Sequence, residues 1–418
     1  MNVLYMTWGE TPRSYGVFNS QVIKQFLKTK NKLPDAKFSF ISAVPIFHSG
    51  LLREKLGYKD EIKKIKEEFT LDNIDFTWVP MVIPQNLIYT TNFIFNYVQC
   101  TTQLLVNYKV DLASYDIVHC RSYFAAYAAN KLREKYNYRY KVVFDARGFL
   151  PEEIALKEKL HEKSKKYSFL KVLESYLLEH SDVTITVSDT MYESFYDKHS
   201  KKLENIYLST DFEKLVSKNK KRKAIELDTQ INILYLGALG VNSWHQPNVL
   251  LKVFKKIKLL YKNAILTIIT TDDHEKLKTF FTELDERDLK FLSIKNHDEL
   301  ANELNKVDLG VLPYRENGSF AEEIVGKSIL GTKTVEYLAS GIPVLCNEDC
   351  GGAAALIMKN PKFGIVEKKK KMSELSEASL HDLLNSHLEQ HDFDMLYNYF
   401  DYSSNAKKYA DIYESLML

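Results

Sequence analysis

The chain contains 418 residues, of which 45% are hydrophobic and 27% are charged, and its formal net charge at pH 7 is only +2. These proportions are typical of a soluble globular protein, and the length predicts two or three domains. A charge so close to zero argues against a nucleic-acid-binding protein, which needs an excess of Lys and Arg to displace counterions.

The first half of the chain alternates short apolar runs with helical patterns, starting at residue 2. The apolar runs are "NVLYMTW", "FSFISAV", "FTWVPMV", "DIVHC", "KVVFDAR", "VTITVS" and "NIYLS". This alternation predicts βαβ units and a parallel sheet whose strands are buried on both faces.

Neither a signal peptide nor a membrane span is predicted. The opening "MNVLYMTWGE" lacks a basic segment followed by a long apolar run. Residues 76–108 contain no charged side chain, but Pro80, Pro84 and several Asn, Gln and Thr residues interrupt the apolar character that a span requires. Two interpretations stay open for this stretch: a strand leading into a buried helix, or an apolar lip that touches lipid or a lipid-linked substrate.

The four cysteines, Cys100, Cys120, Cys346 and Cys350, do not form the paired framework of a disulfide-rich protein. Cys346 and Cys350 also lack a second Cys or His pair that would complete a zinc site. We therefore expect four reduced thiols, a cytoplasmic location and no bound metal.

Two predicted strands of the first half end in titratable residues. "DIVHCRS" places His119 and Arg121 at one strand end, and "VVFDARGFLPEE" places Asp145 and Arg147 at the next. Buried opposite charges at a strand end are rarely present for stability, which favours a catalytic role for Asp145 and Arg147 over a structural ion pair. For His119 a catalytic role and a buried structural histidine both remain open.

The segment that follows, residues 153–180, predicts one or two amphipathic helices with Lys residues on the polar side. A solvated face is the simple interpretation of these lysines, and adhesion to an anionic lipid surface is the alternative. Glu152 and Glu153, next to Pro151, suit the first turn of a helix.

A basic, polar run at residues 211–229 predicts a linker, after which a second series of strands begins. Its strands are "INILYLGALG", "AILTIITT", "LKFLSIKN", "DLGVLPYR", "IPVLCN" and "FGIVEK". We predict two doubly wound α/β domains that face each other across a cleft, with ligands beyond the carboxyl ends of the strands. The expected boundaries are 1–215 for the first domain, 230–395 for the second, and 396–418 for a C-terminal helix that crosses back toward the first.

The stretch "GTKTVEYLASGIPVLCNEDCGG" at residues 331–352 combines a helix start with two charged side chains. Thr332 is the expected N-cap, and Lys333 and Glu336, three residues apart, share one helix face. Free N–H groups and a Lys at a helix start suit phosphate, and a carboxylate one turn later suits the two hydroxyls of a ribose. The alternative is an exposed Lys–Glu salt bridge of little energetic value.

The run "KTVEYLASGIPVL" followed by "GG", with "DLGVLPYR" before it, resembles the nucleotide-sugar-binding signature of glycosyltransferase family 4. These are retaining enzymes of the GT-B fold, with two Rossmann-like domains and a C-terminal helix that packs back on the first domain. "DARGFLPEE" is similar to a subset that builds bacterial surface polysaccharides.

The resemblance implies roles for particular residues. Glu336 would bind the ribose, Lys333 and the helix start at Thr332 would bind the phosphates, and Gly237, Gly240 and Gly16 would bring backbone close to the donor. The C-terminal resemblance is the more specific one, because a polar loop with Gly16 after the first strand occurs in many Rossmann-like domains.

Two departures from the family pattern concern the donor. The family's second Glu, eight positions before Glu336 and in contact with the donor sugar, is Ser328 here. The Arg and Lys that often follow the Gly237–Gly240 turn are absent, and His245 is the only titratable group before Pro247. The resemblance therefore predicts that Lys333 and backbone meet most of the phosphate charge, with Arg315 or Lys327 as further candidates.

The resemblance implies a metal-independent transferase that needs no cofactor and moves a sugar from a nucleotide-diphosphate donor to a glycan, lipid-linked or protein acceptor. It also implies a cytoplasmic protein that contacts the inner face of the plasma membrane. Two alternatives remain: a nucleotide-sugar 2-epimerase of related fold, and a degenerate member that only binds a glycan or a partner.

Overall fold

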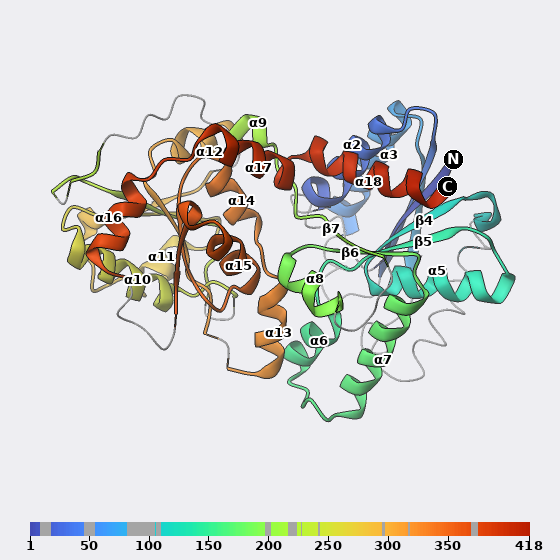
Figure 1. Cartoon of the computed structure of the whole chain (residues 1–418), viewed down its shortest axis with the longest axis horizontal. Coiled ribbons are helices and arrows are strands. Elements are labelled where there is room, and N and C mark those ends of the chain that lie inside the picture. Colours follow the sequence, from blue (N-terminus) through green and yellow to red (C-terminus); the bar gives the residue numbers. More distant parts are fainter. Residues whose placement is uncertain are drawn as a thin grey trace. The chain divides into compact units, whose positions relative to one another are not determined.

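The structure is a computed structural model that describes residues 1–8, 18–45, 55–81, 105, 110–196, 202–215, 224–226, 228–240, 243–294, 297–316, 318–368 and 375–418. The chain divides into two compact units (Figure 1). Unit 1 comprises Met1–Tyr207 and Tyr402–Leu418, and unit 2 comprises Leu208–Asp401.

Unit 1 is built on a seven-stranded parallel sheet with the strand order β3-β2-β1-β4-β5-β6-β7. Its strands are β1 (Asn2–Trp8), β2 (Lys37–Pro45), β3 (Asp75–Met81), β4 (Ile117–Arg121), β5 (Lys141–Asp145), β6 (Val183–Thr186) and β7 (Leu203–Asn205). The first six coincide with the predicted apolar runs. The seventh was predicted at residues 205–209, but its partner β6 ends at Thr186, which pairs with Asn205, so the ladder cannot extend further.

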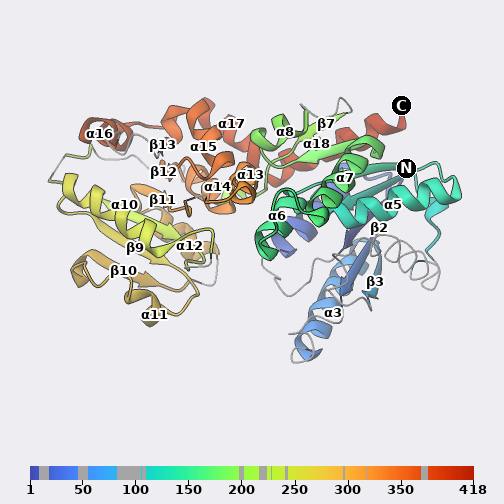
Figure 2. The ribbon, with the colours of Figure 1, turned by 90° about the horizontal axis from the view of Figure 1, so that it is seen from below.

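The helices of unit 1 connect these strands, and the last helix of the chain joins them. They are α2 (Lys24–Lys32), α3 (Lys55–Leu71), α5 (Tyr123–Tyr136), α6 (Leu150–Glu158), α7 (Lys165–His180), α8 (Asp189–Tyr196) and α18 (Tyr402–Met417). Helix α18 lies along α2 (Figure 1), and its Tyr409, Ile412 and Tyr413 enter the core of unit 1. Helices α5 and α7 lie side by side (Figure 2).

Unit 2 is built on a six-stranded parallel sheet with the order β10-β9-β8-β11-β12-β13. Its strands are β8 (Asn232–Leu236), β9 (Ile265–Ile269), β10 (Leu289–Leu292), β11 (Leu309–Leu312), β12 (Val344–Asn347) and β13 (Gly364–Glu367). Its helices are α9 (Phe212–Leu215), α10 (Pro247–Leu260), α11 (His274–Lys278), α12 (His297–Leu304), α13 (Phe320–Ser328), α14 (Thr332–Ala339), α15 (Gly351–Lys359), α16 (Glu377–Asn385) and α17 (Gln390–Phe400). All six predicted strands are present.

The strand order reverses once in each sheet, between β1 and β4 in unit 1 and between β8 and β11 in unit 2. Right-handed connections on either side of such a reversal place helices on both faces, and the loops beyond the carboxyl ends of the two central strands diverge. This is the doubly wound arrangement, and the predicted GT-B fold with two Rossmann-like domains is confirmed.

Most of the uncharged stretch at residues 76–108 lies outside the described residues; of it the structure gives β3 as far as Met81, and Leu105. Among the described residues, no helix is both long and apolar enough to cross a bilayer.

Candidate functional site

The turn after β8 lies at the strand reversal of unit 2, and its first residue is Gly237. The φ angle of Gly237 is +104°, and its N–H donates to the carbonyl of Ile269 at 2.8 Å. A Cβ at this position would lie 2.4 Å from Cε and 2.9 Å from Nζ of Lys333. The turn therefore requires glycine both for its backbone conformation and for the space that Lys333 occupies. Gly240 carries no such requirement, since a Cβ there would meet only Ser243 Cβ at 3.8 Å.

Lys333 reaches from the first turn of α14 to the end of β8, where two uncharged side chains receive it. Its Nζ lies 2.7 Å from Nδ1 of His245 and 3.1 Å from the hydroxyl of Tyr235, and 5.0 Å from the centre of the Tyr235 ring. The Tyr235 hydroxyl is 2.8 Å from the same His245 nitrogen and also donates to the carbonyl of Ala238. Lys333 thus points away from Glu336 instead of pairing with it.

The start of α14 presents unused backbone donors. Its N-cap is Gly331, not Thr332 as predicted; Thr332 is the first helical residue, and no side chain caps the helix. The N–H of Thr334 donates to the Gly331 carbonyl at 3.0 Å, whereas the N–H groups of Thr332 and Lys333 have no acceptor among the described residues. A helix start of this kind attracts anions.

Gly341 ends α14 in the left-handed conformation, with φ of +67°. Its N–H donates to the Leu338 carbonyl and that of Ile342 donates to the Tyr337 carbonyl, each at 2.9 Å. This pair of bonds is a Schellman motif, which fixes the length of the helix and leads directly into β12.

Glu336 lies one turn after Lys333 and is partly exposed. Within the described part of the chain, no side chain forms a hydrogen bond or an ion pair with its carboxylate. Lys333 and Glu336 therefore do not form the salt bridge that was the alternative interpretation of this pair. Both oxygens of Glu336 are available as acceptors for a ligand.

Burial shifts the pKa values of this cluster toward the uncharged forms. It lowers the pKa of Lys333 to about 8, although Glu336 and Asp272 act in the opposite direction. It raises the pKa of Glu336 to about 7, opposed by Lys333. It also lowers the pKa of His245 well below the usual range, and the Lys333 charge lowers it further, so His245 is neutral at physiological pH.

The loop that carries His245 is fixed at both ends. The N–H of Leu239 donates to Asp272 Oδ2 at 2.7 Å, and the N–H of Arg315 donates to the Trp244 carbonyl at 2.8 Å. The His245 ring packs edge-on against Tyr314, with ring centres 4.3 Å apart. Asp272, which follows β9, thus braces the loop, and the short helix α11 begins two residues later.

Arg315, a candidate for phosphate charge, is paired inside its own loop. Its guanidinium contacts Glu322, whose second oxygen accepts from the N–H of Gly318 at 2.8 Å. Glu322 therefore serves as the partner of Arg315. Lys327, the other candidate, lies in the last turn of α13.

Ser328 is the last residue of α13, and its hydroxyl donates to the Val325 carbonyl of the same helix at 2.9 Å. The glycine pair that follows β12, Gly351 and Gly352, begins helix α15. A Cβ on Gly351 would lie 2.9 Å from Lys327 Cα, and one on Gly352 would lie 2.5 Å from the Ile329 carbonyl oxygen. These glycines let α15 approach the backbone of the α13–α14 connection.

In unit 1 the structure brings the three predicted catalytic residues together beside the strand reversal. Asp145 Oδ2 lies 3.1 Å from Arg147 Nε, 3.5 Å from His119 Nε2 and 3.8 Å from Arg121 Nη1. Burial alone would raise the pKa of Asp145, but the charges of Arg147 and its other neighbours hold it below the usual value. Asp145 is therefore an anion at neutral pH.

His119 and Asp145 are both completely buried. The His119 ring stacks on Tyr5 at 4.4 Å between centres, its Nδ1 lies 2.8 Å from the Tyr413 hydroxyl of α18, and burial lowers its pKa. In this geometry neither side chain reaches the surface. The structural alternative for His119 fits its surroundings better than the predicted catalytic role, because a catalytic side chain must reach the substrate.

Arg147 is the most exposed member of this group, with 14% of its side chain accessible against 7% for Arg121. Its backbone has a φ angle of +61°, uncommon for a residue other than glycine, and its buried Nη1 makes no hydrogen bond within the described residues. Strained backbone that persists is frequent at functional sites, where the surroundings hold it.

A buried polar network braces the loop after Arg147. Tyr123 donates to the Gly148 carbonyl at 3.1 Å and to Glu174 at 2.9 Å. Lys171 pairs with Glu174 and, at 2.9 Å, with Glu152. The sequence analysis assigned Glu152 only to the first turn of a helix, because nothing in the local sequence indicates that α6 and α7 enclose this side chain.

Two expectations remain, one for Gly16 and one for a bound metal. Gly16 falls outside the described residues. Within the described ranges no group of three His, Cys, Asp or Glu residues is placed to hold a metal ion.

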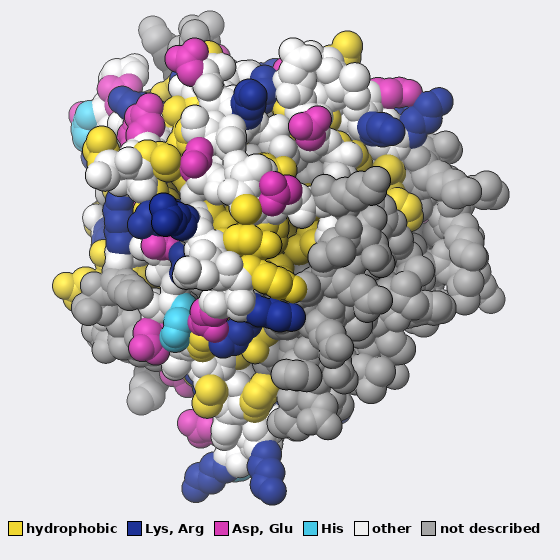
Figure 3. All heavy atoms as spheres, turned by 90° about the vertical axis from the view of Figure 1, so that its right-hand side faces the viewer, with side chains coloured by type: hydrophobic (Ala, Val, Ile, Leu, Met, Phe, Trp, Pro, Cys, Tyr) yellow, Lys and Arg dark blue, Asp and Glu magenta, His cyan; other side chains and the backbone are white. Residues whose placement is uncertain are grey.

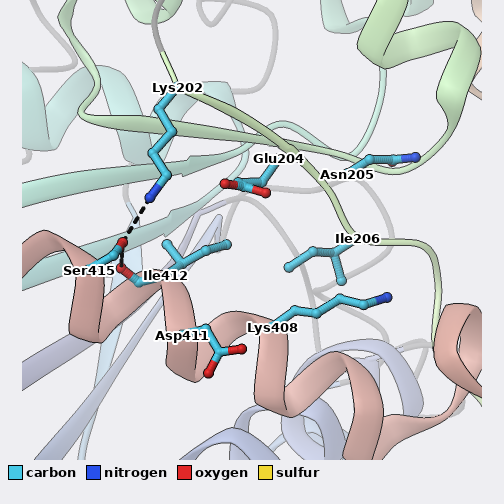
Figure 4. A pocket seen from close by; sticks show the side chains of 8 residues that line it. All are labelled: Lys202, Glu204, Asn205, Ile206, Lys408, Asp411, Ile412 and Ser415. Atoms are coloured by element: carbon cyan, nitrogen blue, oxygen red, sulfur yellow. Dashed lines mark hydrogen bonds between the residues drawn. The ribbon is translucent and has the colours of Figure 1, made fainter.

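A cavity of about 230 Å³ lies in unit 1 between β7 and α18 (Figure 4), and no predicted site residue lines it. It is lined by Lys202, Glu204, Asn205, Ile206, Lys408, Asp411, Ile412 and Ser415. The lining contains two lysines and two carboxylates, so its charges favour neither an anionic nor a cationic ligand.

The two doubly wound units define a GT-B architecture, and in unit 2 the start of α14 lies beside the strand reversal. Residues 230–385, all within unit 2, match the sequence model of the family described as glycosyl transferases group 1. This match supports a glycosyltransferase. A comparison with curated proteins gave no significant match.

Solved structures with the same fold span the whole chain. A sucrose-phosphate synthase from Thermosynechococcus elongatus has a TM-score of 0.60 and 11% identity, covering 100% of this chain and 99% of its own. The lipopolysaccharide outer core galactosyltransferase WaaB has a TM-score of 0.64 and 13% identity, covering 99% and 100%. HepE of Anabaena, in complex with UDP and glucose, has a TM-score of 0.56 and 13% identity, covering 99% and 100%. At these identities the likeness establishes the fold alone.

Proposed function

We propose that the protein is a retaining glycosyltransferase that moves a sugar from a nucleotide-diphosphate donor to an acceptor hydroxyl, with the nucleotide held at the start of α14. One observation carries the proposal. The Lys333 ammonium, the N–H groups of Thr332 and Lys333, and the Glu336 carboxylate lie together at the strand reversal of unit 2. Neither these N–H groups nor the carboxylate has a partner among the residues that the structure describes.

The chemistry of these groups suits two parts of the donor, the charged diphosphate and the uncharged ribose. A departing diphosphate develops negative charge, and a preorganised cation with backbone donors stabilises that charge without rearrangement. A carboxylate that accepts from two neighbouring hydroxyls fits a ribose. The turn at Gly237 keeps Lys333 in place, and the family match covers all of these residues.

The remaining parts of the proposal rest on the sequence resemblance. We propose a glycan, lipid-linked or protein acceptor, assembly of a surface polysaccharide, glycolipid or glycoprotein glycan, and metal-independent chemistry. Arg147 is the candidate of unit 1 for a contact with the reacting groups, since it keeps exposed surface, and Asp145 orients it.

Cytoplasmic location and peripheral contact with an anionic membrane are also part of the proposal. Two of the lysines that suggested such contact are paired: Lys166 contacts Glu158, and Lys171 contacts Glu152 and Glu174. On the face of unit 1 shown in Figure 3, the described Lys and Arg side chains are interspersed with Asp and Glu. Flotation with vesicles that contain or lack anionic lipid tests this part separately.

The test of the nucleotide site is a thermal-shift series with UDP, GDP and ADP. A ligand that binds the folded protein raises its melting temperature by mass action. We expect at least one nucleotide to stabilise the parent, and we expect Lys333→Ala or Glu336→Ala to abolish the shift. Loss of one charged hydrogen bond costs about 1.5–3 kcal/mol, or roughly 10- to 100-fold in affinity.

The chain offers a matched control in the same unit. Glu275 and Lys278 form an exposed pair, also three residues apart, with 2.6 Å between Lys278 Nζ and Glu275 Oε1. Glu275→Ala and Lys278→Ala should leave the nucleotide shift unchanged. If the Lys333 and Glu336 variants respond like these controls, the proposed nucleotide site is wrong.

Incubation of the parent with candidate nucleotide sugars then tests the reaction. Release of nucleotide only in the presence of an acceptor supports transfer. Interconversion of the donor sugar without an acceptor would instead indicate an epimerase, and stable binding with neither reaction would indicate a binding protein.

A further inference from the structure

The contacts of Lys333 differ from those of an ordinary buried lysine, because no carboxylate forms an ion pair with its ammonium group among the described residues. Buried charges in proteins are normally paired with an opposite charge. Here the two nearest acceptors, His245 Nδ1 at 2.7 Å and the Tyr235 hydroxyl at 3.1 Å, are both neutral. The ammonium group is therefore held in a fixed direction by two neutral acceptors.

Counting hydrogens shows what remains for a ligand. An ammonium has three N–H donors and no acceptor, so His245 must accept at Nδ1 and carry its own hydrogen on Nε2. Tyr235 has one hydrogen, which the Ala238 carbonyl and His245 can accept, and its oxygen accepts from Lys333. Two of the three N–H groups of Lys333 thus have an acceptor, and the third has none within the described part of the chain.

We propose that His245 is a positioning residue of the nucleotide site: with Tyr235 it holds the Lys333 ammonium through neutral acceptors and leaves one N–H for a diphosphate oxygen. This inference rests on the proposed function and deepens it. In the region between Gly240 and Pro247, where the resemblance leads one to expect further basic residues, the chain instead supplies an orienting group for the one lysine of the site.

The arrangement couples ligand binding to proton uptake. The charged or titratable groups around Lys333 are Glu336 on its own helix, Asp272 after β9, Tyr235 on β8 and His245 in the following loop. Burial lowers the pKa of Lys333 to about 8 against the opposing effect of Glu336 and Asp272. A bound diphosphate favours the charged ammonium, so near pH 8 the protein should take up about half a proton per nucleotide.

Calorimetric titration tests the inference with the nucleotide of the UDP, GDP and ADP panel that gives the largest thermal shift. Titrations at pH 8 in Tris and in HEPES report proton uptake from the difference in buffer ionisation heat. The variants are His245→Ala, which removes the acceptor, and His245→Asn, whose amide oxygen takes a place similar to that of Nδ1. His274→Ala, which removes a ring 3.2 Å from the Thr270 carbonyl in the same unit, is the control.

We expect His245→Ala to weaken nucleotide binding by about 3- to 10-fold, the usual value of one hydrogen bond. We also expect it to abolish proton uptake at pH 8, because water entering the vacated space solvates the ammonium and raises the pKa of Lys333. His245→Asn should retain most of both properties, and His274→Ala should match the parent. A merely structural histidine would not change proton uptake.

The outcomes separate this inference from the proposed function. If the parent binds nucleotide and Lys333→Ala does not, but His245→Ala matches the parent in affinity and proton uptake, the role of His245 is refuted and the site stands. If His245→Ala does not fold, Tyr235→Phe serves instead, because it lacks the second acceptor of Lys333. Proton uptake equal to that of the parent in Tyr235→Phe would refute the proposal that these two neutral side chains hold the ammonium group. If the parent binds none of the three nucleotides, the proposed function fails and this inference fails with it.

Discussion

Replacement of Gly237 by alanine should weaken nucleotide binding by displacing Lys333, although residue 237 itself supplies no side chain to a ligand. The new Cβ would lie 2.4 Å from Lys333 Cε and 2.9 Å from Nζ, closer than any stable carbon contact. The far end of a lysine is flexible, so the protein can relieve the clash cheaply by moving Lys333 away from His245. That movement takes the charge out of the proposed site.

Two separate effects of Gly237→Ala can be estimated. The φ angle of +104° strains any residue other than glycine, which costs about 1–3 kcal/mol of stability. Loss of the oriented Lys333 should weaken nucleotide binding by about 1.5–3 kcal/mol, or roughly 10- to 100-fold, the value of one charged hydrogen bond. For a unit of this size the stability loss corresponds to a fall of roughly 2–4 °C per kcal/mol in melting temperature.

Gly240→Ala is the matched control, because its Cβ would meet only Ser243 Cβ at 3.8 Å. The assay is calorimetric nucleotide titration of the parent, Gly237→Ala, Gly240→Ala, Lys333→Ala and the double variant Gly237→Ala/Lys333→Ala. We expect Gly237→Ala to bind no more tightly than Lys333→Ala, and the double variant to bind no worse than either. Parent-like affinity in a folded Gly237→Ala protein would refute the reasoning that this glycine makes room for the phosphate-binding cation.

Three further predictions follow from the same geometry. Nucleotide affinity should fall as pH rises through about 8, because Lys333 loses its proton there. Thermal shifts measured from pH 7 to 9.5 test this, and Lys333→Ala should make the affinity independent of pH in this range. The folded state raises the pKa of Glu336 to about 7, so the contribution of this group to stability is complete below its unfolded pKa and is lost as pH rises through 7. Glu336→Gln should therefore stabilise the ligand-free protein at pH 8 by on the order of 1 kcal/mol, but not at pH 4.5. Midpoints of denaturant unfolding at the two pH values test this. Asp145→Asn leaves Arg147 beside an uncharged group in a buried site and should cost about 3–5 kcal/mol of stability, whereas nucleotide affinity measured on the folded fraction should match the parent.

The fold could be predicted from the sequence because parallel strands buried on both faces appear as continuous apolar runs. Twelve of the thirteen strands lie where such runs stand, and the exception, β7, is a three-residue strand whose length depends on where its neighbour β6 ends. The length of a short edge strand is a property of the pairing, which the local sequence does not contain.

The candidate site could be predicted in part, because a helix start, Lys333 and Glu336 are local features of one stretch. The direction of Lys333 could not, since it depends on His245 and Tyr235, which are 88 and 98 residues away in the sequence. In unit 1, the spacing placed His119 and Asp145 at strand ends, but their complete burial depends in part on Tyr413 of α18, which is 294 residues away from His119. Contacts of this range arise only when the chain has folded.

A crystal structure of the protein with the nucleotide of the UDP, GDP and ADP panel that binds would show whether unit 2 holds a nucleoside diphosphate at the start of α14. We expect a diphosphate oxygen within hydrogen-bond reach of Lys333 Nζ and of the N–H groups of Thr332 and Lys333, with the ribose hydroxyls on Glu336. A nucleotide bound elsewhere, in contact with neither Lys333 nor Glu336, would refute the proposed site.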